Sequence, residues 1–149
     1  MSVTPEQATQ FVHAVVPAIG RLGVTVEAVG PGSVQLRVPL AGNANHMGTM
    51  YAGALFTLME LPGGLLPLGT LDPTKYTPIV TEVEIRFLAA ARTDVMLSAE
   101  MDPDELHRLA AQADETGRAD FTLELEGLDT AGRVVVRSTA HYQLRPNRG

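Results

Sequence analysis

The sequence predicts an α+β domain in which a curved, mostly antiparallel sheet wraps around one central apolar helix. The stretch of residues 47–70 holds a single charged residue, Glu60, and is otherwise apolar or small. Several other segments alternate apolar and polar residues, as half-buried strands do. The late strands are joined by short connections, which favours antiparallel pairing. A helix that is apolar on nearly every side needs cover on most of its surface, and a curved sheet supplies that cover. The 149 residues suit one domain, residues 1–149.

The N-terminal segment predicts a helix over about residues 4–20. Thr4 and Gln7 have the spacing of a capping box, and Pro5 suits the first turn. Apolar residues then recur at helical spacing from Phe11 to Ile19. The remaining core elements are expected between about residues 22 and 144.

Two strands and the central helix follow. Residues 22–29 and 34–38 read as strands around a Gly-Pro-Gly turn, and residues 39–48 read as a loop. The apolar helix is expected from about residue 52 to residue 61 or slightly beyond. Pro62 has no N–H to donate to the carbonyl four residues earlier, so the helix must kink or end close to Glu60.

The second half of the chain predicts about four strands and a short helix. Residues 71–78 are rich in turn residues, and the alternation of Val83, Ile85 and Phe87 with charged residues predicts an amphipathic strand. A further strand is expected over residues 95–101, and a short helix begins near Asp102. The last two strands are expected around residues 121–125 and over residues 134–144.

Composition excludes several function classes. The net charge of −6 and the sequence pI near 5.1 argue against nonspecific binding to nucleic acid or to an acidic membrane surface. The chain has no cysteine, which excludes disulfides, thiol catalysis and cysteine-ligated zinc. The four histidines show no metal-ligand spacing, so no metal site is expected.

The long apolar stretch raises the question of a membrane span. It contains Glu60, Pro62, Pro67 and a Gly-Gly pair, and a spanning helix is strongly disfavoured by an acid near its middle. A helix buried in a soluble core is the simpler interpretation. The first ten residues have neither a basic nor an apolar region of a signal peptide, so a cytoplasmic location is expected.

Glu60 is the first candidate for chemistry. A charge in an apolar environment costs several kcal/mol unless something uses or compensates it. Gly53 lies where the same helix should begin, and a helix N-terminus offers free backbone N–H groups and the positive end of the helix dipole.

The central motif resembles that of hotdog-fold acyl-CoA thioesterases of the phenylacetate-pathway (PaaI) type. In that family an Asn is followed six residues later by His-Gly-Gly, and an acid stands nine residues past the His. Asn45, residues 51–53 (Tyr-Ala-Gly) and Glu60 keep this spacing. Residues 85–92, 116–119 and 129–135 resemble later strands of the family, so the resemblance covers roughly residues 22–144. The Gly-Thr-Met-Tyr-Ala-Gly run is similar to the YiiD C-terminal-domain branch.

The resemblance implies the hotdog fold and the hydrolysis of acyl-CoA or a related acyl thioester. It implies no metal and no redox cofactor, and coenzyme A is part of the substrate. Carried over by position, the catalytic residues are Glu60 as general base or nucleophile, Gly53 as the N–H that polarises the carbonyl, and Asn45. The expected substrate-binding residues are Tyr51, Ala52, Thr57, Arg86 and Arg92. Tyr51 and Ala52 depart from the family's His and first Gly, and a tyrosine is a poor base near neutral pH.

The spacing of Gly53 and Glu60 predicts a homo-oligomer. Seven residues of helix at about 1.5 Å each separate the two by about 10 Å, whereas an oxyanion must lie about 3 Å from its donor. One thioester therefore reaches both groups only if one of them comes from another subunit. Two antiparallel central helices in a two-fold dimer would supply this arrangement twice, and the resemblance also implies dimers, or tetramers, with shared sites.

Simpler interpretations stand beside these roles. Glu60 could be partly exposed or pair with an arginine, Asn45 could only form a turn, and Gly53 could only permit close packing. Tyr51 could be a wall residue, Thr57 could bond a backbone carbonyl, and the arginines could be ordinary surface residues. A non-catalytic acyl or acyl-CoA binding protein is the main alternative function. A hotdog hydratase is disfavoured, because the Asp-His pair it would need is not found after Asn45.

Overall fold

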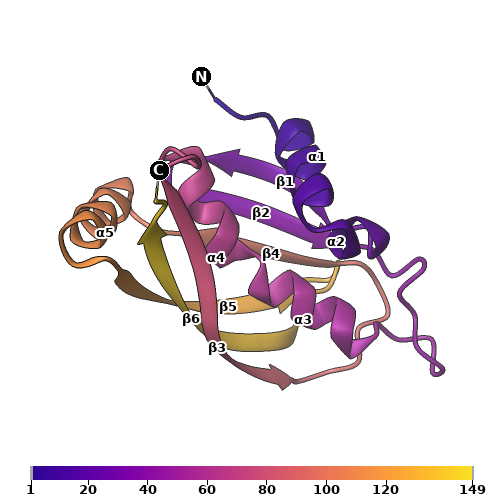
Figure 1. Ribbon diagram of the computed structural model, residues 1–149. Coiled ribbons are helices and arrows are strands. Elements are labelled where there is room, and N and C mark those ends of the chain that lie inside the picture. Colours follow the sequence, from indigo (N-terminus) through magenta and orange to yellow (C-terminus); the bar gives the residue numbers. More distant parts are fainter. Residues whose placement is uncertain (1, 149) are drawn as a thin grey trace.

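The computed structural model describes residues 2–148, in which six strands form one antiparallel sheet in the order β1-β2-β4-β5-β6-β3 (Figure 1). The strands are β1 (Thr25–Gly30), β2 (Ser33–Val38), β3 (Tyr76–Phe87), β4 (Val95–Glu100), β5 (Ala119–Leu128) and β6 (Val134–Pro146). The helices are α1 (Pro5–Val15), α2 (Pro17–Arg21), α3 (Ala52–Glu60), α4 (Pro62–Leu65) and α5 (Pro103–Thr116), with a 3₁₀ turn, η1 (Leu66–Gly69), after α4.

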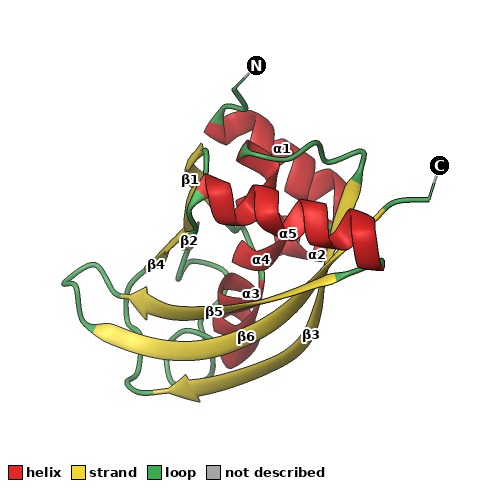
Figure 2. Ribbon diagram, turned by 90° about the vertical axis from the view of Figure 1, so that its left-hand side faces the viewer, coloured by secondary structure: helices red, strands yellow, loops and turns green. Residues whose placement is uncertain are grey.

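The sheet curves around α3, which lies in its concave side (Figure 2). Four apolar residues of α3 are buried against the sheet, and Leu58 and Met59 have no exposed surface. On the sheet side, β5 alternates strictly between buried and exposed residues along its whole length. The predicted α+β fold, with a curved antiparallel sheet around a central apolar helix, is confirmed.

The predicted N-terminal helix is divided in two by a proline. The capping box of Thr4 and Gln7 is present, and α1 ends at Val15. Val16 has an extended backbone conformation (φ −129°, ψ 86°) because the ring of Pro17 disfavours a helical residue before it. Pro17 then opens α2, so the helical segment changes direction at Val16.

The central helix ends where Pro62 requires it to end. α3 stops at Glu60, Leu61 keeps helical dihedrals, and Pro62 occupies the first position of α4. The helical run of residues 52–69 is long and apolar enough to cross a membrane by length and composition, with a mean hydropathy of 1.2. Because 56% of this run is buried inside the fold, it forms the core of the domain.

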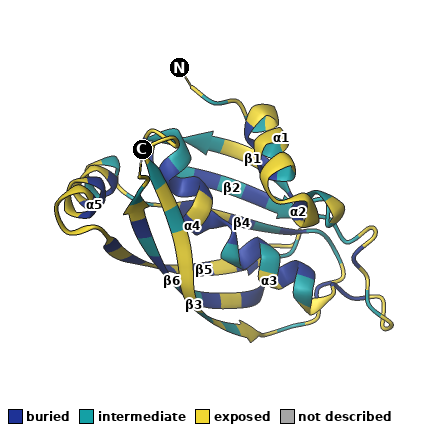
Figure 3. Cartoon of the chain, in the orientation of Figure 1, coloured by how far each residue is buried: buried dark blue, intermediate teal, exposed yellow. Residues whose placement is uncertain are grey.

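Strand β3 is longer than the sequence predicts, since it begins at Tyr76 within the segment read as a turn. The proline in this segment, Pro78, is tolerated because β3 is an edge strand, where a missing N–H breaks no ladder. Most of its residues are exposed or half-buried (Figure 3). One of the two edges of the sheet is therefore a twelve-residue strand.

Candidate active site

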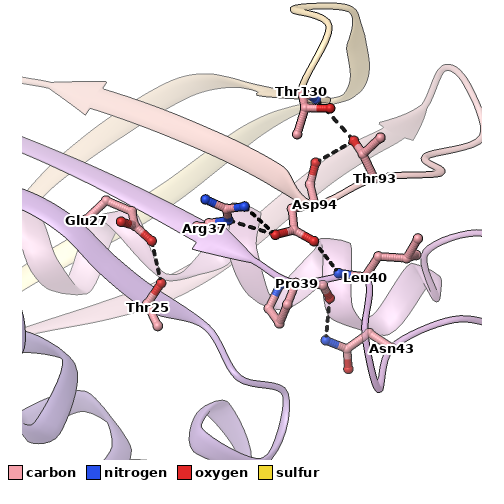
Figure 4. Close-up of polar contacts among 9 residues, drawn as sticks. All are labelled: Thr25, Glu27, Arg37, Pro39, Leu40, Asn43, Thr93, Asp94 and Thr130. Atoms are coloured by element: carbon pink, nitrogen blue, oxygen red, sulfur yellow. Dashed lines mark hydrogen bonds and ion pairs between the residues drawn. The ribbon is translucent and has the colours of Figure 1, made fainter.

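The loop that leads into α3 is fixed at its start by Asp94 (Figure 4). The carboxylate of Asp94 accepts from the backbone N–H of Leu40 at 2.9 Å and from Nε of Arg37 at 2.8 Å. The first of these bonds, followed by the arginine, lowers the pKa of Asp94 below its ordinary value. The end of β2 and the start of the loop are thereby attached to the beginning of β4.

Two asparagines hold the rest of this loop. Asn43 is buried, and its Nδ2 donates to the carbonyls of Leu22 and Pro39 at 2.7 and 2.9 Å. Oδ1 of Asn45 accepts from the backbone N–H groups of Met47 and Thr49 at 2.9 and 3.1 Å. Asn45 therefore forms a turn within the loop, as the simpler interpretation holds. Its role in orienting the acid or the substrate stays a prediction.

The N-terminus of α3 carries two backbone N–H groups that have no acceptor among residues 2–148. Ala54 and Leu55 both donate to the carbonyl of Tyr51, whereas Ala52 and Gly53 donate to no described group. Tyr51 is 57% exposed and its ring lies against Gly53. A Cβ built on Gly53 would lie 2.7 Å from Cζ and 2.9 Å from Oη of Tyr51, so a side chain at this position would require the exposed Tyr51 ring to move.

Gly53, Thr57 and Glu60 share one accessible face of α3. All three are half-buried, whereas the neighbouring residues Leu58 and Met59 face the core. Oγ1 of Thr57 donates to the carbonyl of Gly53 at 2.9 Å, which is the backbone bond that the simpler interpretation gave it. Along the helix axis Gly53 and Glu60 remain about 10 Å apart.

The carboxylate of Glu60 is half-buried and makes no ion pair or hydrogen bond with any residue from 2 to 148. Loss of hydration raises the pKa of Glu60 above its ordinary value of 4.5. The backbone carbonyl of the same residue accepts from Oη of Tyr142 at 2.7 Å. Burial, and then the charge of Glu60, raise the pKa of Tyr142. A carboxylate whose pKa is raised is a stronger base than an exposed one.

Tyr142 is a site residue that the sequence reasoning missed. It is 2% exposed and its ring stacks on Phe121, with the centroids 5.1 Å apart. Its inward position on β6 follows from the strand pattern, but its contact with the end of α3 does not. The sequence signal was the Gly-Gly pair after Pro62, because a Cβ on Gly63 would overlap the Tyr142 ring.

Glu60 also borders an apolar cavity of about 510 Å³ that sequence reasoning did not predict. The cavity lies between the N-terminal helices, the α4–η1 segment and the start of β3. Its volume falls in the range of small-molecule sites, roughly 300–1,000 Å³. The structure therefore adds to the sequence prediction that the acid Glu60 lies on the wall of an apolar cavity.

The two predicted arginines lie in different places. The backbone carbonyl of Ala91 accepts from the N–H of Met50 at 2.8 Å, which brings the neighbouring Arg92 close to the N-terminus of α3. Arg86 is exposed on β3 and pairs in register with Arg137, on the convex face of the sheet. Within one chain the structure therefore brings Arg92, but not Arg86, toward the face of α3 that holds Gly53.

Residues 4–144 match the family described as a domain of unknown function, DUF4442. A solved structure from Pseudomonas aeruginosa, the protein of unknown function PA5026, described as a probable thioesterase, is similar to the chain with a TM-score of 0.90. Its sequence is 43% identical, and the match covers 99% of each chain. The chain belongs to the DUF4442 family of hotdog-fold thioesterase-superfamily proteins.

More distant solved structures share the fold. The protein of unknown function OLEI01261 from Chlorobaculum tepidum has a TM-score of 0.81 at 21% identity, over 98% of this chain and 99% of its own. The thioesterase HI1161 from Haemophilus influenzae has a TM-score of 0.74 at 14% identity, over 98% and 93%. No curated protein matches the sequence significantly. The predicted hotdog fold is confirmed, and the narrower likeness to the YiiD branch stays a prediction.

Proposed function

We propose that this DUF4442 protein hydrolyses acyl-CoA or a related acyl thioester, with Glu60 as the reacting acid. The observation that carries the proposal is the carboxylate of Glu60, which is half-buried, has no partner in the described part of the chain and lies beside an apolar cavity. The 43% identity to PA5026, described as a probable thioesterase, supports the same reaction class.

The reaction needs a nucleophile and donors for the oxyanion that forms on the thioester carbonyl. As a general base, Glu60 takes a proton from water while the water oxygen attacks the carbonyl carbon. The C–S bond then breaks, and the proton passes to the leaving thiolate. As a nucleophile, Glu60 instead forms a mixed anhydride as the thiolate leaves, and water then hydrolyses the anhydride. The free N–H of Gly53 donates to the oxyanion, and the Tyr51 hydroxyl beside it orients the carbonyl or the water.

A two-fold dimer brings the two halves of this site together. Gly53 and Glu60 of one chain are about 10 Å apart and cannot contact one carbonyl. Edge strand β3 offers a free row of backbone groups, and Phe87 and Leu88 at its end are 51% and 48% exposed. Antiparallel pairing of two β3 edges places two α3 helices side by side, so that Gly53 faces Glu60 of the partner subunit. In this assembly Asn45 and Thr57 shape the site and Arg92 binds coenzyme A phosphates, whereas Arg86 stays on the opposite, convex face of the joined sheet.

One observation favours a second function, acyl-CoA binding without turnover. The Tyr51 ring lies where a side chain on Gly53 would be, at the position where the related thioesterases have His. If this ring keeps the substrate carbonyl away from the Gly53 N–H, the site holds an acyl group without polarising it. Glu60→Gln separates the two functions, because it removes the acid and keeps the shape.

The test is release of free thiol from a panel of acyl-CoA substrates by the unmodified protein and by Glu60→Gln and Glu60→Ala. We expect Glu60→Gln to lower kcat by about 10²–10⁴-fold, while acyl-CoA binding by calorimetry is retained. Glu84→Gln makes the same change on the convex face of the sheet and serves as the matched control. Binding without turnover in the unmodified protein would refute the enzyme and support the binding function. A monomer in light scattering would refute the shared site.

A further inference from the structure

We propose that the cavity beside Glu60 binds the hydrocarbon chain of an unsubstituted fatty acyl thioester, and that Gly64 sets the chain length it accepts. This inference rests on the proposed function, since it names the substrate of the same site. Two observations support it: the lining of the cavity, and the different surroundings of the neighbouring glycines Gly63 and Gly64.

The lining of the cavity is mostly hydrocarbon. Helix α1 contributes Phe11 and Val15, which are 48% and 61% exposed at its edge. Leu61, Leu65 and residues of η1 form the opposite side. A fatty acyl chain would cover this exposed apolar surface, at about 25 cal/mol for each Å² removed from water.

The polar side chains that line the cavity already have partners, apart from Glu60. Asp72 accepts from the backbone N–H and the hydroxyl of Thr74. Oη of Tyr76 donates to Asp114 at 2.8 Å, and Oγ1 of Thr77 donates to Asn147. Both bonds to Asp72 use Oδ1, and the hydroxyls of Tyr76 and Thr77 already donate, so a second carboxylate on the acyl chain would find no free side-chain donor and would lose its hydration. A hydroxyl would exchange water for a mostly apolar lining. The cavity therefore favours a chain without polar substituents, with the thioester at Glu60.

Gly63 and Gly64 are adjacent but are glycines for different reasons. A Cβ on Gly63 would overlap the ring of Tyr142, whereas a Cβ on Gly64 would meet no atom within 4 Å. Gly64 lines the cavity, and its backbone does not have a positive φ, so a side chain there enters open space without strain. Gly64 is exposed and lines the cavity, so we expect its missing side chain to leave part of the cavity free and a larger residue to shorten it.

The experiment measures kcat/KM for butanoyl-, octanoyl-, dodecanoyl- and hexadecanoyl-CoA, with 4-hydroxybenzoyl-CoA and a hydroxylated dodecanoyl-CoA as polar substrates. For the unmodified protein we expect kcat/KM to rise about fourfold per added methylene, or about 0.8 kcal/mol, until the cavity is full. The polar substrates should be poorer than the plain chain of equal length. Gly64→Leu should lower kcat/KM for dodecanoyl-CoA by about tenfold or more and leave butanoyl-CoA within about twofold.

Ala111→Leu adds the same side chain to an exposed position of α5, away from the cavity, and should leave the profile unchanged. Thermal unfolding checks that Gly64→Leu folds, and Gly64→Ala provides a milder variant with a smaller effect in the same direction.

The cavity inference would be refuted if kcat/KM did not change with chain length, or if Gly64→Leu did not change this dependence. Turnover itself would still support the thioesterase function. If no thioester is cleaved, calorimetry with dodecanoate decides: binding that Gly64→Leu weakens supports the cavity, and no binding refutes it. A Gly64→Leu protein that changes only its oligomeric state would show that a second copy of the chain occupies this face.

Discussion

Replacing Gly63 by alanine tests how the end of α3 is held. Gly63 lies in α4, and the Tyr142 ring fills the place of its missing side chain. The ring cannot move aside easily, because it is 2% exposed, stacks on Phe121 and donates to the Glu60 carbonyl at 2.7 Å. An added methyl must therefore displace either the ring or the helix.

The expected cost follows from three contributions. Overpacking a well-filled core costs about 1–3 kcal/mol, and breaking the bond from Tyr142 to Glu60 costs about 0.5–1.5 kcal/mol. Exchanging glycine for alanine in a helix returns about 0.5–1 kcal/mol. Gly63→Ala should therefore lower the free energy of unfolding by about 1–3 kcal/mol, since part of the strain is relieved when the bond breaks.

The assay is urea unfolding followed by circular dichroism at fixed protein concentration, with Gly64→Ala as the matched control. Gly64→Ala makes the same exchange one residue later in open space, so it should be neutral or stabilise by up to about 1 kcal/mol. Equal midpoints for the two variants would show that Tyr142 does not pack against Gly63. The same result would show that the Tyr142 ring does not hold the end of α3 through Gly63.

Three further predictions concern single polar groups. Ser138 is 3% exposed and its hydroxyl has no partner among the described residues, so Ser138→Ala should raise the unfolding free energy by up to about 1 kcal/mol; a loss in the same urea assay would contradict this. Asp94→Asn should cost about 1 kcal/mol at pH 7. The cost should disappear as the pH falls below 3.8 through the lowered pKa of folded Asp94, which urea titrations at several pH values would check. Glu60→Gln should raise the free energy of unfolding at pH 7, and this gain should vanish below pH 4.5, the ordinary pKa of the group. If the gain in unfolding free energy persisted in acid, its electrostatic origin would be refuted.

The sequence predicts those parts of the fold that depend on local pattern. The alternation around Val83 and Ile85 identified β3, and Pro62 identified the end of α3, because both act through neighbouring residues. The break at Val16 follows from the same chemistry at Pro17, but the apolar spacing across it favoured one continuous helix. The start of β3 was missed because Pro78 is a turn signal unless the strand lies at an edge, and edge position is a property of the whole sheet.

For the candidate site, sequence reasoning gave the residues along α3 but not their surroundings. Gly53, Thr57 and Glu60 fall on one face because the helix period requires it. The contact of Tyr142 with Gly63 joins residues about eighty positions apart, and the cavity joins residues 11–19 with residues 60–78. Only tertiary packing decides such contacts. The position of Arg86 on the convex face was predictable from strand alternation once its register with β6 was known.

The sign of the effect at Glu60 separates a functional acid from a structural one. A structural carboxylate is stabilised by its partners in the folded state, so its pKa falls, as that of Asp94 does, and its removal destabilises the protein at neutral pH. Among residues 2–148 Glu60 has no such partner, and burial raises its pKa, so the folded protein binds the proton more tightly than the unfolded chain does. The stability it contributes therefore falls as the pH rises from 4.5 through the raised pKa, and the ionised form costs stability above it. An acid that lowers the stability of the folded protein when it is ionised has no structural benefit. An interaction that it makes only with substrate explains its presence, and this is the role proposed for Glu60.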